Sequence, residues 1–250
     1  QRTSSAASDV YKRQIEELSV QFIKTGLPIA TYFSLSKILW LLRNVDEVNK
    51  AKLDNDLCFG TVDSWLLYKL TGNHVTDVTN ASRTLLMDLH TLNWMEDVIN
   101  RLDIPLDSLP SIKPSMFNYG TNEGILKNVP ITAVLGDQQA SLFGQNCIAS
   151  GDVKNTYGTG CFALTNTGSE IVHSNNGLLS TVAYQKDGDK PQYAIEGSVS
   201  IAGAAVQWLR DNLNIIKESS DVEALAMAEK DNGDVYFCLL YTSPSPRDPE

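Results

Sequence analysis

The sequence predicts a mixed α/β protein of two domains that meet near residue 150, and three features of the chain support this prediction. Before that point, amphipathic helices alternate with short apolar segments typical of strands. Beyond it, a run of hairpin-forming strands precedes a helix. The polar, glycine-containing stretch ASGDV at 149–153 lies between the two patterns and is the expected boundary.

The first predicted helix covers residues 32–44, YFSLSKILWLLRN. Ser34 or Ser36 is expected to cap it, because a serine hydroxyl can accept a hydrogen bond from a free N–H of the first turn. Apolar residues recur at helical spacing and predict a stripe that consists of Ile38, Leu41 and Leu42.

The next segments predict a second and a third helix. In 59–72, Thr61 is the expected cap and Gly72 the expected C-terminal stop, with apolar faces supplied by Val62, Leu66 and residues 68–70. Residues 73–94 mix Thr, Asn and Ser with short apolar pieces, which predicts strand or loop around a turn. Residues 94–104 predict a helix that ends before Pro105.

Three further segments lead up to the boundary. The stretch DSLPSIKPSMFNYG at 107–120 is broken by prolines and predicts a connection on the surface. The stretch VPITAVLGD at 129–137 is short, β-branched and apolar on both faces, so a strand buried in a sheet is expected. A helix is predicted to follow over 138–146.

Beyond the boundary, hairpins are predicted. Residues 153–168 predict two strands around the turn at 158–160, Gly-Thr-Gly. A meander continues with turn signals at 176–177 and 187–188, and residues 201–215 predict a helix with small residues in its first turn.

The two ends of the chain differ in composition from the rest. Residues 1–14 have no apolar period, and residues 239–250 close on a proline-rich run that suits neither a helix nor a central strand. Both resemble translated adaptor sequence, so we expect them to be non-native and to pack against nothing; native flexible tails are the alternative.

Composition excludes several classes of protein. The chain has 250 residues and a net charge of -10, which argues against a nucleic-acid partner but leaves room for a small phosphorylated ligand. The four cysteines are scattered and predict reduced thiols in the cytoplasm, and the isolated histidines predict no metal site. No apolar run approaches the roughly 20 residues of a membrane span.

Asp137 is the first candidate for chemistry. It could simply cap the helix that follows, since Asp is a favoured cap. It could instead be a catalytic base, because ligands of open α/β sheets gather where strands end. Capping alone does not explain why Gly136 precedes it and two glutamines follow.

Two glycine-containing stretches are weaker candidates. The turn around Thr159 could face an anion with its backbone N–H groups and hydroxyl, or it could be an ordinary hairpin turn. Gly203 at a helix start could let a ligand approach the backbone, with Gln207 one turn later, or it could allow close helix–strand packing.

Taken together, these stretches resemble one family, the carbohydrate kinases of the FGGY type, and within it the members that phosphorylate glycerol. The helix at 32–44 fits the family signature, with Tyr32, Ser34, Lys37, Trp40 and Asn44 at the matching positions. FGTVDSWLLYKLTG, TNASRT, GDQQASLFGQ, NTYGTGCF, NGLLST and AGAAVQWLRD follow in the family's order, so that the resemblance covers roughly residues 20–235.

The resemblance implies an actin/hexokinase-like fold of ribonuclease-H-like domains, present here only in part. Residues 15–147 would be the second half of the N-terminal, polyol-binding domain, and residues 148–238 the start of the C-terminal, nucleotide-binding domain. It also implies the phosphorylation of glycerol by ATP with Mg²⁺, and it allows a homo-oligomer for the full-length protein.

The resemblance assigns roles residue by residue. Asp137 is the expected general base, and it shares the glycerol contacts with Tyr32 and Gln138, while Phe162 forms an apolar wall. The expected ATP contacts are Thr159, Gly203 and Gln207.

The family's first phosphate-binding loop, its Arg-Glu pair for the polyol and its adenosine loop do not occur in the sequence, so we expect this chain alone to be inactive. A kinase for another polyol and a non-catalytic, actin-like binding module remain the alternatives.

Overall fold

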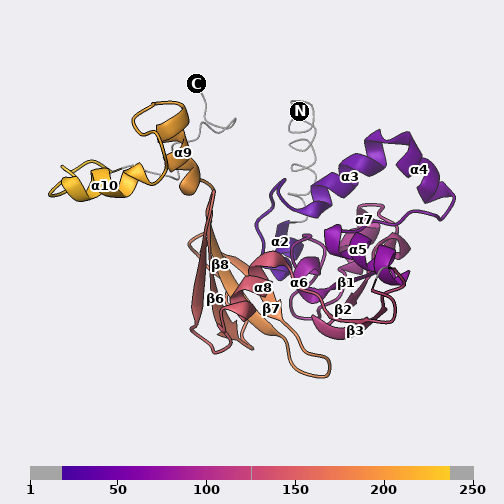
Figure 1. The fold of residues 1–250 in the computed structure, drawn as a ribbon. Helices are drawn as coiled ribbons and strands as arrows, with labels where there is room; N and C mark the ends of the chain where they lie inside the picture. The colour runs from indigo at the N-terminus through magenta and orange to yellow at the C-terminus, as the bar shows by residue number, and fades with distance from the viewer. Residues whose placement is uncertain (1–18, 125, 237–250) are drawn as a thin grey trace.

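The structure, a computed structural model, describes residues 19–124 and 126–236. The predictions for 1–14 and 239–250 lie outside the described residues. Figure 1 shows a helix-rich N-terminal region, residues 19–133, beside a four-stranded antiparallel sheet, with two further helices beyond one end of the sheet. The predicted mixed α/β class is confirmed.

The N-terminal region contains many short elements. Its helices are α2 (Ser19–Phe22), η1 (Ile23–Thr25), α3 (Ser34–Asn44), α4 (Asp46–Leu53), α5 (Val62–Thr71), α6 (Val78–Ala81), α7 (Glu96–Arg101) and η2 (Leu106–Ser108). Its strands are β1 (Val75–Asp77), β2 (Ser111–Lys113), β3 (Met116–Thr121) and β4 (Pro130–Ala133). β1 pairs with β2 in parallel, and β3 pairs with β4 antiparallel.

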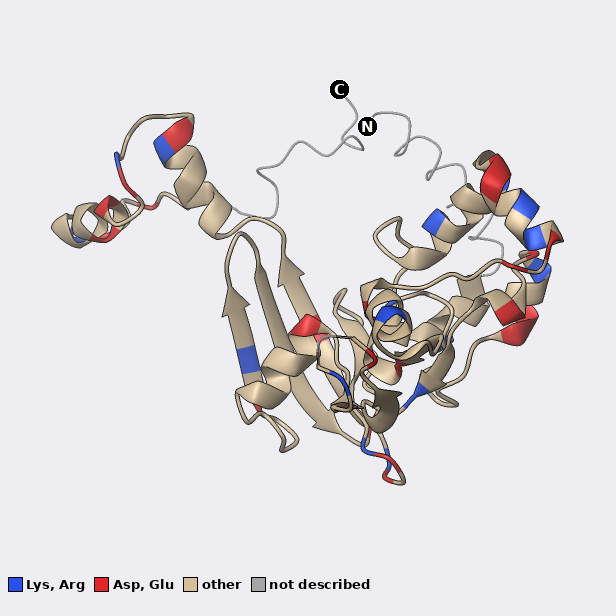
Figure 2. Cartoon of the chain, turned by 45° about the vertical axis from the view of Figure 1, so that its right-hand side comes forward, with Lys and Arg blue, Asp and Glu red and all other residues tan. Residues whose placement is uncertain are grey.

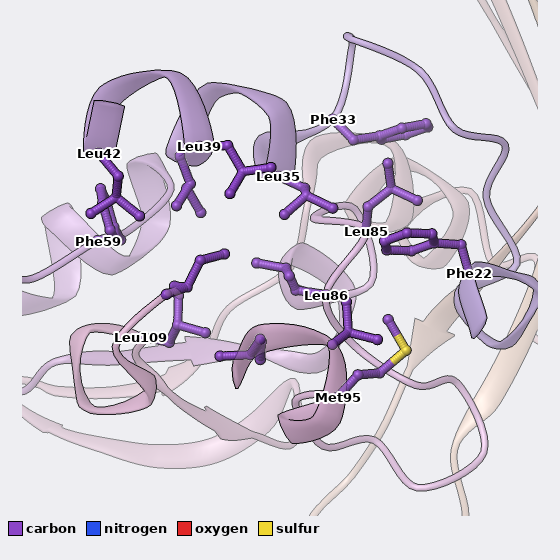
Figure 3. Close-up of a cluster of buried hydrophobic side chains, with 14 of the residues drawn as sticks. Phe22, Phe33, Leu35, Leu39, Leu42, Phe59, Leu85, Leu86, Met95 and Leu109 are labelled. Carbon is purple, nitrogen blue, oxygen red and sulfur yellow. The ribbon is translucent and has the colours of Figure 1, made fainter. Parts of the chain in front are cut away.

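The largest apolar cluster lies beneath α3 (Figure 3). Leu35, Leu39 and Leu42 recur at spacings of three and four residues, so one face of the helix is buried against Leu86 and Leu109. Of the predicted stripe, Ile38 and Leu42 are buried, whereas Leu41 packs at the edge of the cluster and is only partly buried.

The predicted serine cap of α3 is wrong. Ser34 is the first helical residue and Phe33 takes the cap position, where an apolar side chain cannot accept a hydrogen bond. The first turn is held instead by tertiary structure, because the N–H of Leu35 donates to the carbonyl of Thr84 at 3.1 Å.

The second predicted helix is α5, and its ends are those predicted. Thr61 occupies the cap position, although its hydroxyl bonds the Asp63 carboxylate instead of a backbone N–H. Gly72 ends the helix in the left-handed conformation, with its N–H on the Tyr68 carbonyl at 2.8 Å.

The predicted apolar faces of α5 are not buried. Val62 is 76% exposed, Leu66 46% and Tyr68 54%. The buried residues of the helix are Ser64 and Leu67, so only a narrow stripe of α5 contacts the rest of the described structure.

The segment 107–120 is not the surface connection that its prolines predict. Pro110 and Pro114 flank β2 instead of interrupting it, so three residues remain free to pair with β1. Leu109 is 8% exposed and Ser115 is fully buried, which places much of the segment in the interior.

The strand predicted over 129–137 is present as β4, but it is not buried on both faces. Pro130, Thr132 and Ala133 are exposed, and Ile131 is only partly buried. The physical reason is that β4 pairs with β3 alone, in a two-stranded ladder whose other edge has no neighbouring strand among the described residues.

The C-terminal sheet (β5–β8) has the strand order β5-β6-β8-β7. Its strands are β5 (Val153–Tyr157), β6 (Cys161–Gly168), β7 (Leu179–Tyr184) and β8 (Gln192–Val199), and α9 (Gly203–Asp211) and α10 (Asp221–Ala228) follow. All neighbouring strands are antiparallel, as the predicted hairpins and meander require.

Helix α8 (Asp137–Gly144) packs on this sheet, where Leu142 contacts Leu164 and Ala194. Val78 of α6 reaches the same sheet in a cluster with Val182 and Tyr193. The N-terminal region and the C-terminal sheet therefore pack directly against each other. The domain boundary near residue 150 stays a prediction.

Charged residues are mixed over the surface of the N-terminal region. Figure 2 shows Lys and Arg beside Asp and Glu along its outer helices. Among the helices that the structure describes, none has both the length and the apolar character needed to cross a membrane.

Candidate active site

A cleft of about 490 Å³ opens where the N-terminal region meets α8 and the C-terminal sheet. The residues that line it come from segments far apart in the sequence: Tyr32, Lys37, Asn80, Arg83, Gly136, Asp137, Gln138, Gln139, Phe162 and Glu196. It thus brings together the four residues predicted to contact the polyol, Tyr32, Asp137, Gln138 and Phe162.

Asp137 is the first residue of α8, and its side chain is exposed to the cleft. The cap position belongs to Gly136, which has no side chain, so helix capping does not account for the carboxylate. One carboxylate oxygen accepts from the N–H of Gln138 at 2.8 Å, and the other remains available toward the cleft apart from a long 3.4 Å contact with the Gln138 amide.

A series of buried hydrogen bonds fixes the backbone just before Asp137. The N–H of Gly136 donates to the Thr79 hydroxyl at 2.8 Å, and that hydroxyl donates to Asp77 at 2.7 Å. Asp77 also accepts from the N–H groups of Thr79 and Asn80 and thereby caps α6. This series fixes the point from which α8 presents its first side chain.

Asp77 itself is fully buried. Burial raises the pKa of its carboxyl, and the hydrogen bonds from Asn80, Thr79 and Ser115 act in the opposite direction. Its cap on α6 is a local contact, but its link to the site is not, because Thr79 and Gly136 are 57 residues apart.

The two glutamines that follow Asp137 anchor α8 to the C-terminal sheet. Gln139 is buried and donates to the Thr181 hydroxyl of β7 at 3.2 Å. A side chain at Gly136 would place its Cβ 2.7 Å from the Gln139 amide oxygen, so the Gln139 side chain would have to shift. Gln138 turns the other way, toward β5.

Lys154 of β5 lies beneath the cleft and is only 5% exposed. Its ammonium donates to the amide oxygen of Gln138, to the Thr156 hydroxyl at 2.8 Å and to the Phe162 carbonyl at 3.3 Å. Burial lowers the pKa of this amine, and the nearby carboxylates of Glu196 and Asp137 oppose that shift.

An ion pair crosses the cleft floor between the N-terminal region and β8. Arg83 donates to Glu196 at 3.0 Å, and its guanidinium lies 5.7 Å from the ring centre of Phe33. Within the described residues, one guanidinium nitrogen and one carboxylate oxygen of this pair are buried without a hydrogen-bond partner. The partners are 113 residues apart, so the sequence offered no signal for the pair.

The three residues predicted to contact ATP lie at a second place, the hairpin tip (residues 158–160) and the start of α9. Gly203 donates its N–H to the Gly158 carbonyl at 2.9 Å, and Ala204 donates to the Thr159 carbonyl at 3.2 Å. The structure thus brings Thr159 and Gly203 together, with Gln207 exposed one turn further along α9.

Gly203 has a packing reason to be glycine. A Cβ there would lie 2.6 Å from the Gly158 carbonyl oxygen, so the helix could not sit so close to the tip with any larger residue. Thr159 and Gly158 are nevertheless exposed at the tip, where a hydroxyl and backbone groups can meet a phosphate. Within residues 19–124 and 126–236, no three His, Cys, Asp or Glu side chains gather to hold a metal ion.

The family of the chain is shown by its match to two family descriptions. Residues 1–144 match the FGGY family of carbohydrate kinases, N-terminal domain, and residues 153–243 match the C-terminal domain of the same family.

Curated relatives include two proteins named glycerol kinase. The one from Brucella anthropi is 57% identical over 225 residues, and the one from Methylobacterium radiotolerans is 55% identical over 223 residues. These matches cover 88% and 87% of this chain but only 45% and 44% of the relatives, so the chain spans less than half of their length.

Solved structures agree on the fold. Plasmodium falciparum glycerol kinase with ADP is 40% identical with a TM-score of 0.78, over 87% of this chain and 46% of that one. Ligand-bound xylulose kinase from Lactobacillus acidophilus is 23% identical with a TM-score of 0.74 over 89% and 46%, a likeness of fold alone. The predicted actin/hexokinase-like fold, present in part, is confirmed, and the chain belongs to the FGGY family of carbohydrate kinases.

Proposed function

We propose that this chain is part of an enzyme that transfers a phosphoryl group from ATP to glycerol and forms glycerol 3-phosphate. The observation that carries the proposal is the cleft in which the Asp137 carboxylate lies beside Gln138, Tyr32 and Phe162. The relatives that are more than half identical to the chain and bear the name glycerol kinase support the choice of substrate.

Asp137 is the proposed general base. Its carboxylate takes the proton of the attacking hydroxyl as the oxygen forms its bond to the transferred phosphorus. Its position as the first residue of α8, on a backbone fixed by Thr79, keeps this acceptor in one place. Positioning of this kind is the main task in phosphoryl transfer, because the enzyme does little covalent chemistry itself.

The other cleft residues bind and orient the triol in this proposal. Gln138 and the phenol of Tyr32 offer hydrogen bonds to its hydroxyl groups. Phe162, half-buried on β6, contacts the carbon chain and excludes water from that side.

ATP, bound with Mg²⁺, would supply the phosphoryl group, and Thr159, Gly203 and Gln207 would contact it. The exposed Thr159 hydroxyl at the hairpin tip suits this role. The exposed amide of Gln207 suits it too, because Gln207 follows Gly203 by four residues and so lies on the same face of α9 as Gly203. The ADP named in the Plasmodium falciparum structure supports a nucleotide for this family.

We place the enzyme in the cytoplasm. The three cysteines that the structure describes, Cys58, Cys147 and Cys161, are free thiols, which suits a reducing compartment.

The test is an assay of the full-length enzyme that carries this sequence, with glycerol, xylitol and xylulose as substrates and ATP as donor. We expect glycerol to give the highest kcat/KM. A higher value for another polyol would replace glycerol as the substrate, and no turnover of any of them would favour a non-catalytic, actin-like binding module. The 250-residue chain alone is expected to show no turnover, and formation of glycerol 3-phosphate above a blank would contradict this.

A further inference from the structure

Lys154 is a buried cation for which the proposed mechanism has no use. Burying an ammonium group costs free energy unless it is fully hydrogen-bonded, and this one uses its three donors on Gln138, Thr156 and the Phe162 carbonyl. Two of those three partners belong to residues that line the cleft, Gln138 and Phe162.

The contact with Gln138 fixes which way its amide faces. An ammonium group can only donate, so the atom of Gln138 that it contacts must be the carbonyl oxygen. The NH₂ group is therefore directed away from β5, and its nitrogen lies 3.4 Å from a carboxylate oxygen of Asp137. Lys154 thus reinforces the preference for the NH₂ end that the Asp137 carboxylate also sets.

We propose that Lys154 is a positioning residue that holds the NH₂ group of Gln138 in the cleft beside the Asp137 carboxylate. A fixed donor then stands next to a fixed acceptor. This arrangement suits two hydroxyl groups on neighbouring carbons: one donates its proton to Asp137, and the oxygen of the other accepts from Gln138. The inference rests on the proposed function and extends it to selectivity for substrates with adjacent hydroxyl groups.

The surroundings of Lys154 suit this role. All three polar atoms that the ammonium contacts are oxygens that accept from it, and the carboxylates of Glu196 and Asp137 oppose the lowering of its pKa by burial. The same ammonium also donates to the Phe162 carbonyl on β6. One group therefore helps to position both Gln138 and Phe162, the apolar wall of the cleft.

The experiment compares glycerol with propane-1,3-diol, which lacks the middle hydroxyl, in the full-length enzyme. The measured quantity is the ratio of kcat/KM for the two substrates. Lys154→Met and Gln138→Met are each expected to lower this ratio roughly tenfold, the worth of a single hydrogen bond. The double variant is expected to lower it no further, because Lys154 acts through Gln138.

Lys190→Met is the matched control, since Lys190 lies exposed in the loop between β7 and β8, and its ratio should equal that of the unchanged enzyme. If Lys154→Met reduces kcat/KM equally for both substrates, or if the two losses add in the double variant, Lys154 is only structural and the inference is overturned.

Gln138→Glu provides a test even if Lys154→Met does not fold. The new carboxylate keeps the bond to Lys154 but turns an oxygen, in place of NH₂, toward the cleft. The ratio should fall, and an unchanged ratio would overturn the inference. An unchanged enzyme that phosphorylates neither substrate would instead overturn the proposed function.

Discussion

The cleft around Asp137 and the hairpin tip around Thr159 were both marked in the sequence by a polar residue beside glycine, but they are built differently. In the cleft, side chains from segments far apart in the chain meet through buried hydrogen bonds and an ion pair. At the tip, backbone groups pack on backbone groups, and the side chain of Thr159 is exposed.

A substitution is therefore expected to have a different effect in each of the two regions. A changed side chain in the cleft removes a chemical group but leaves the backbone where it was. A changed residue at the tip alters how closely α9 approaches the sheet, as the 2.6 Å contact of a Cβ at 203 shows. We therefore expect cleft variants to change turnover, and tip variants to change stability.

The largest effect is expected for Asp137→Asn in the full-length enzyme. The change keeps the shape of the side chain but removes the proton acceptor, so kcat should fall by about 10²–10⁴-fold. The melting temperature should barely move, because the side chain is exposed and Gly136 occupies the cap position. Steady-state kinetics and thermal unfolding measure both quantities.

Asp137→Ala is the companion variant. If Asp137 acted as a cap, this change would lower the free energy of unfolding by roughly 0.5–2 kcal/mol and leave turnover per folded molecule near normal. A kcat for Asp137→Asn above about a tenth of the unchanged value would also contradict the catalytic role.

A smaller effect, on stability, is expected at the tip. Gly203→Ala forces a Cβ to within 2.6 Å of the Gly158 carbonyl oxygen, so α9 must shift. We expect a loss of about 1–3 kcal/mol in the free energy of unfolding, typical of overpacking. Urea unfolding of the chain measures it.

Gly158→Ala is the control in the same turn, because the nearest atom to a Cβ there is 3.9 Å away. Equal stability losses in the two variants would show that backbone packing does not distinguish position 203.

Thr79→Val tests the support beneath Asp137. The valine has nearly the same shape, but it leaves the N–H of Gly136 without its acceptor and Asp77 without one donor. Because Gly136 is only partly buried, the loss should be about 1 kcal/mol, near the lower end of the cost of an unpaired donor. Urea unfolding measures the loss, and Thr79→Ser, which keeps the hydroxyl, should restore most of it.

The smallest effect is a pH dependence from Lys154. Burial lowers the pKa of this amine in the folded chain, whereas the unfolded chain keeps the proton up to its ordinary value of about 10.4. Between the lowered value and about 10.4 the unfolded chain holds more protons, so the free energy of unfolding should rise with pH in that window.

Lys154→Met should lack this rise. Urea unfolding of both proteins at pH 7, 9 and 10 measures the two slopes. The same slope in the variant and the unchanged protein would show that another group is responsible.

Local patterns predicted two kinds of element correctly: helices that bury a regular apolar stripe, and hairpins whose turn contains glycine. The helix at 32–44 and the hairpin around 158–160 are examples. Helix α4 was not predicted, because its sequence shows no apolar stripe. None of its residues is buried, so the fold requires no such stripe there. Strand β4 was predicted, but its burial was not, since burial depends on which strands lie beside it.

The candidate site follows the same division. Motifs marked the residues that face the cleft, such as Asp137 and Gln138. They did not mark Asp77, Lys154 or Glu196, because each of these has a partner in another segment of the chain: Ser115, Gln138 and Arg83, respectively. Short-range spacing carries no information about such contacts.

The charges of the cleft have a consequence for the surface of the whole molecule. Two cations, Lys37 and Arg83, and two carboxylates, Asp137 and Glu196, line the cleft, and the Lys154 ammonium lies beneath it, so the cleft is not acidic although the chain carries -10. At physiological ionic strength charges are screened beyond about 8 Å, so an anionic ligand in the cleft responds mainly to these five groups. Acidic residues can therefore accumulate on the outer surface and favour solubility without repelling a polyphosphate from the site.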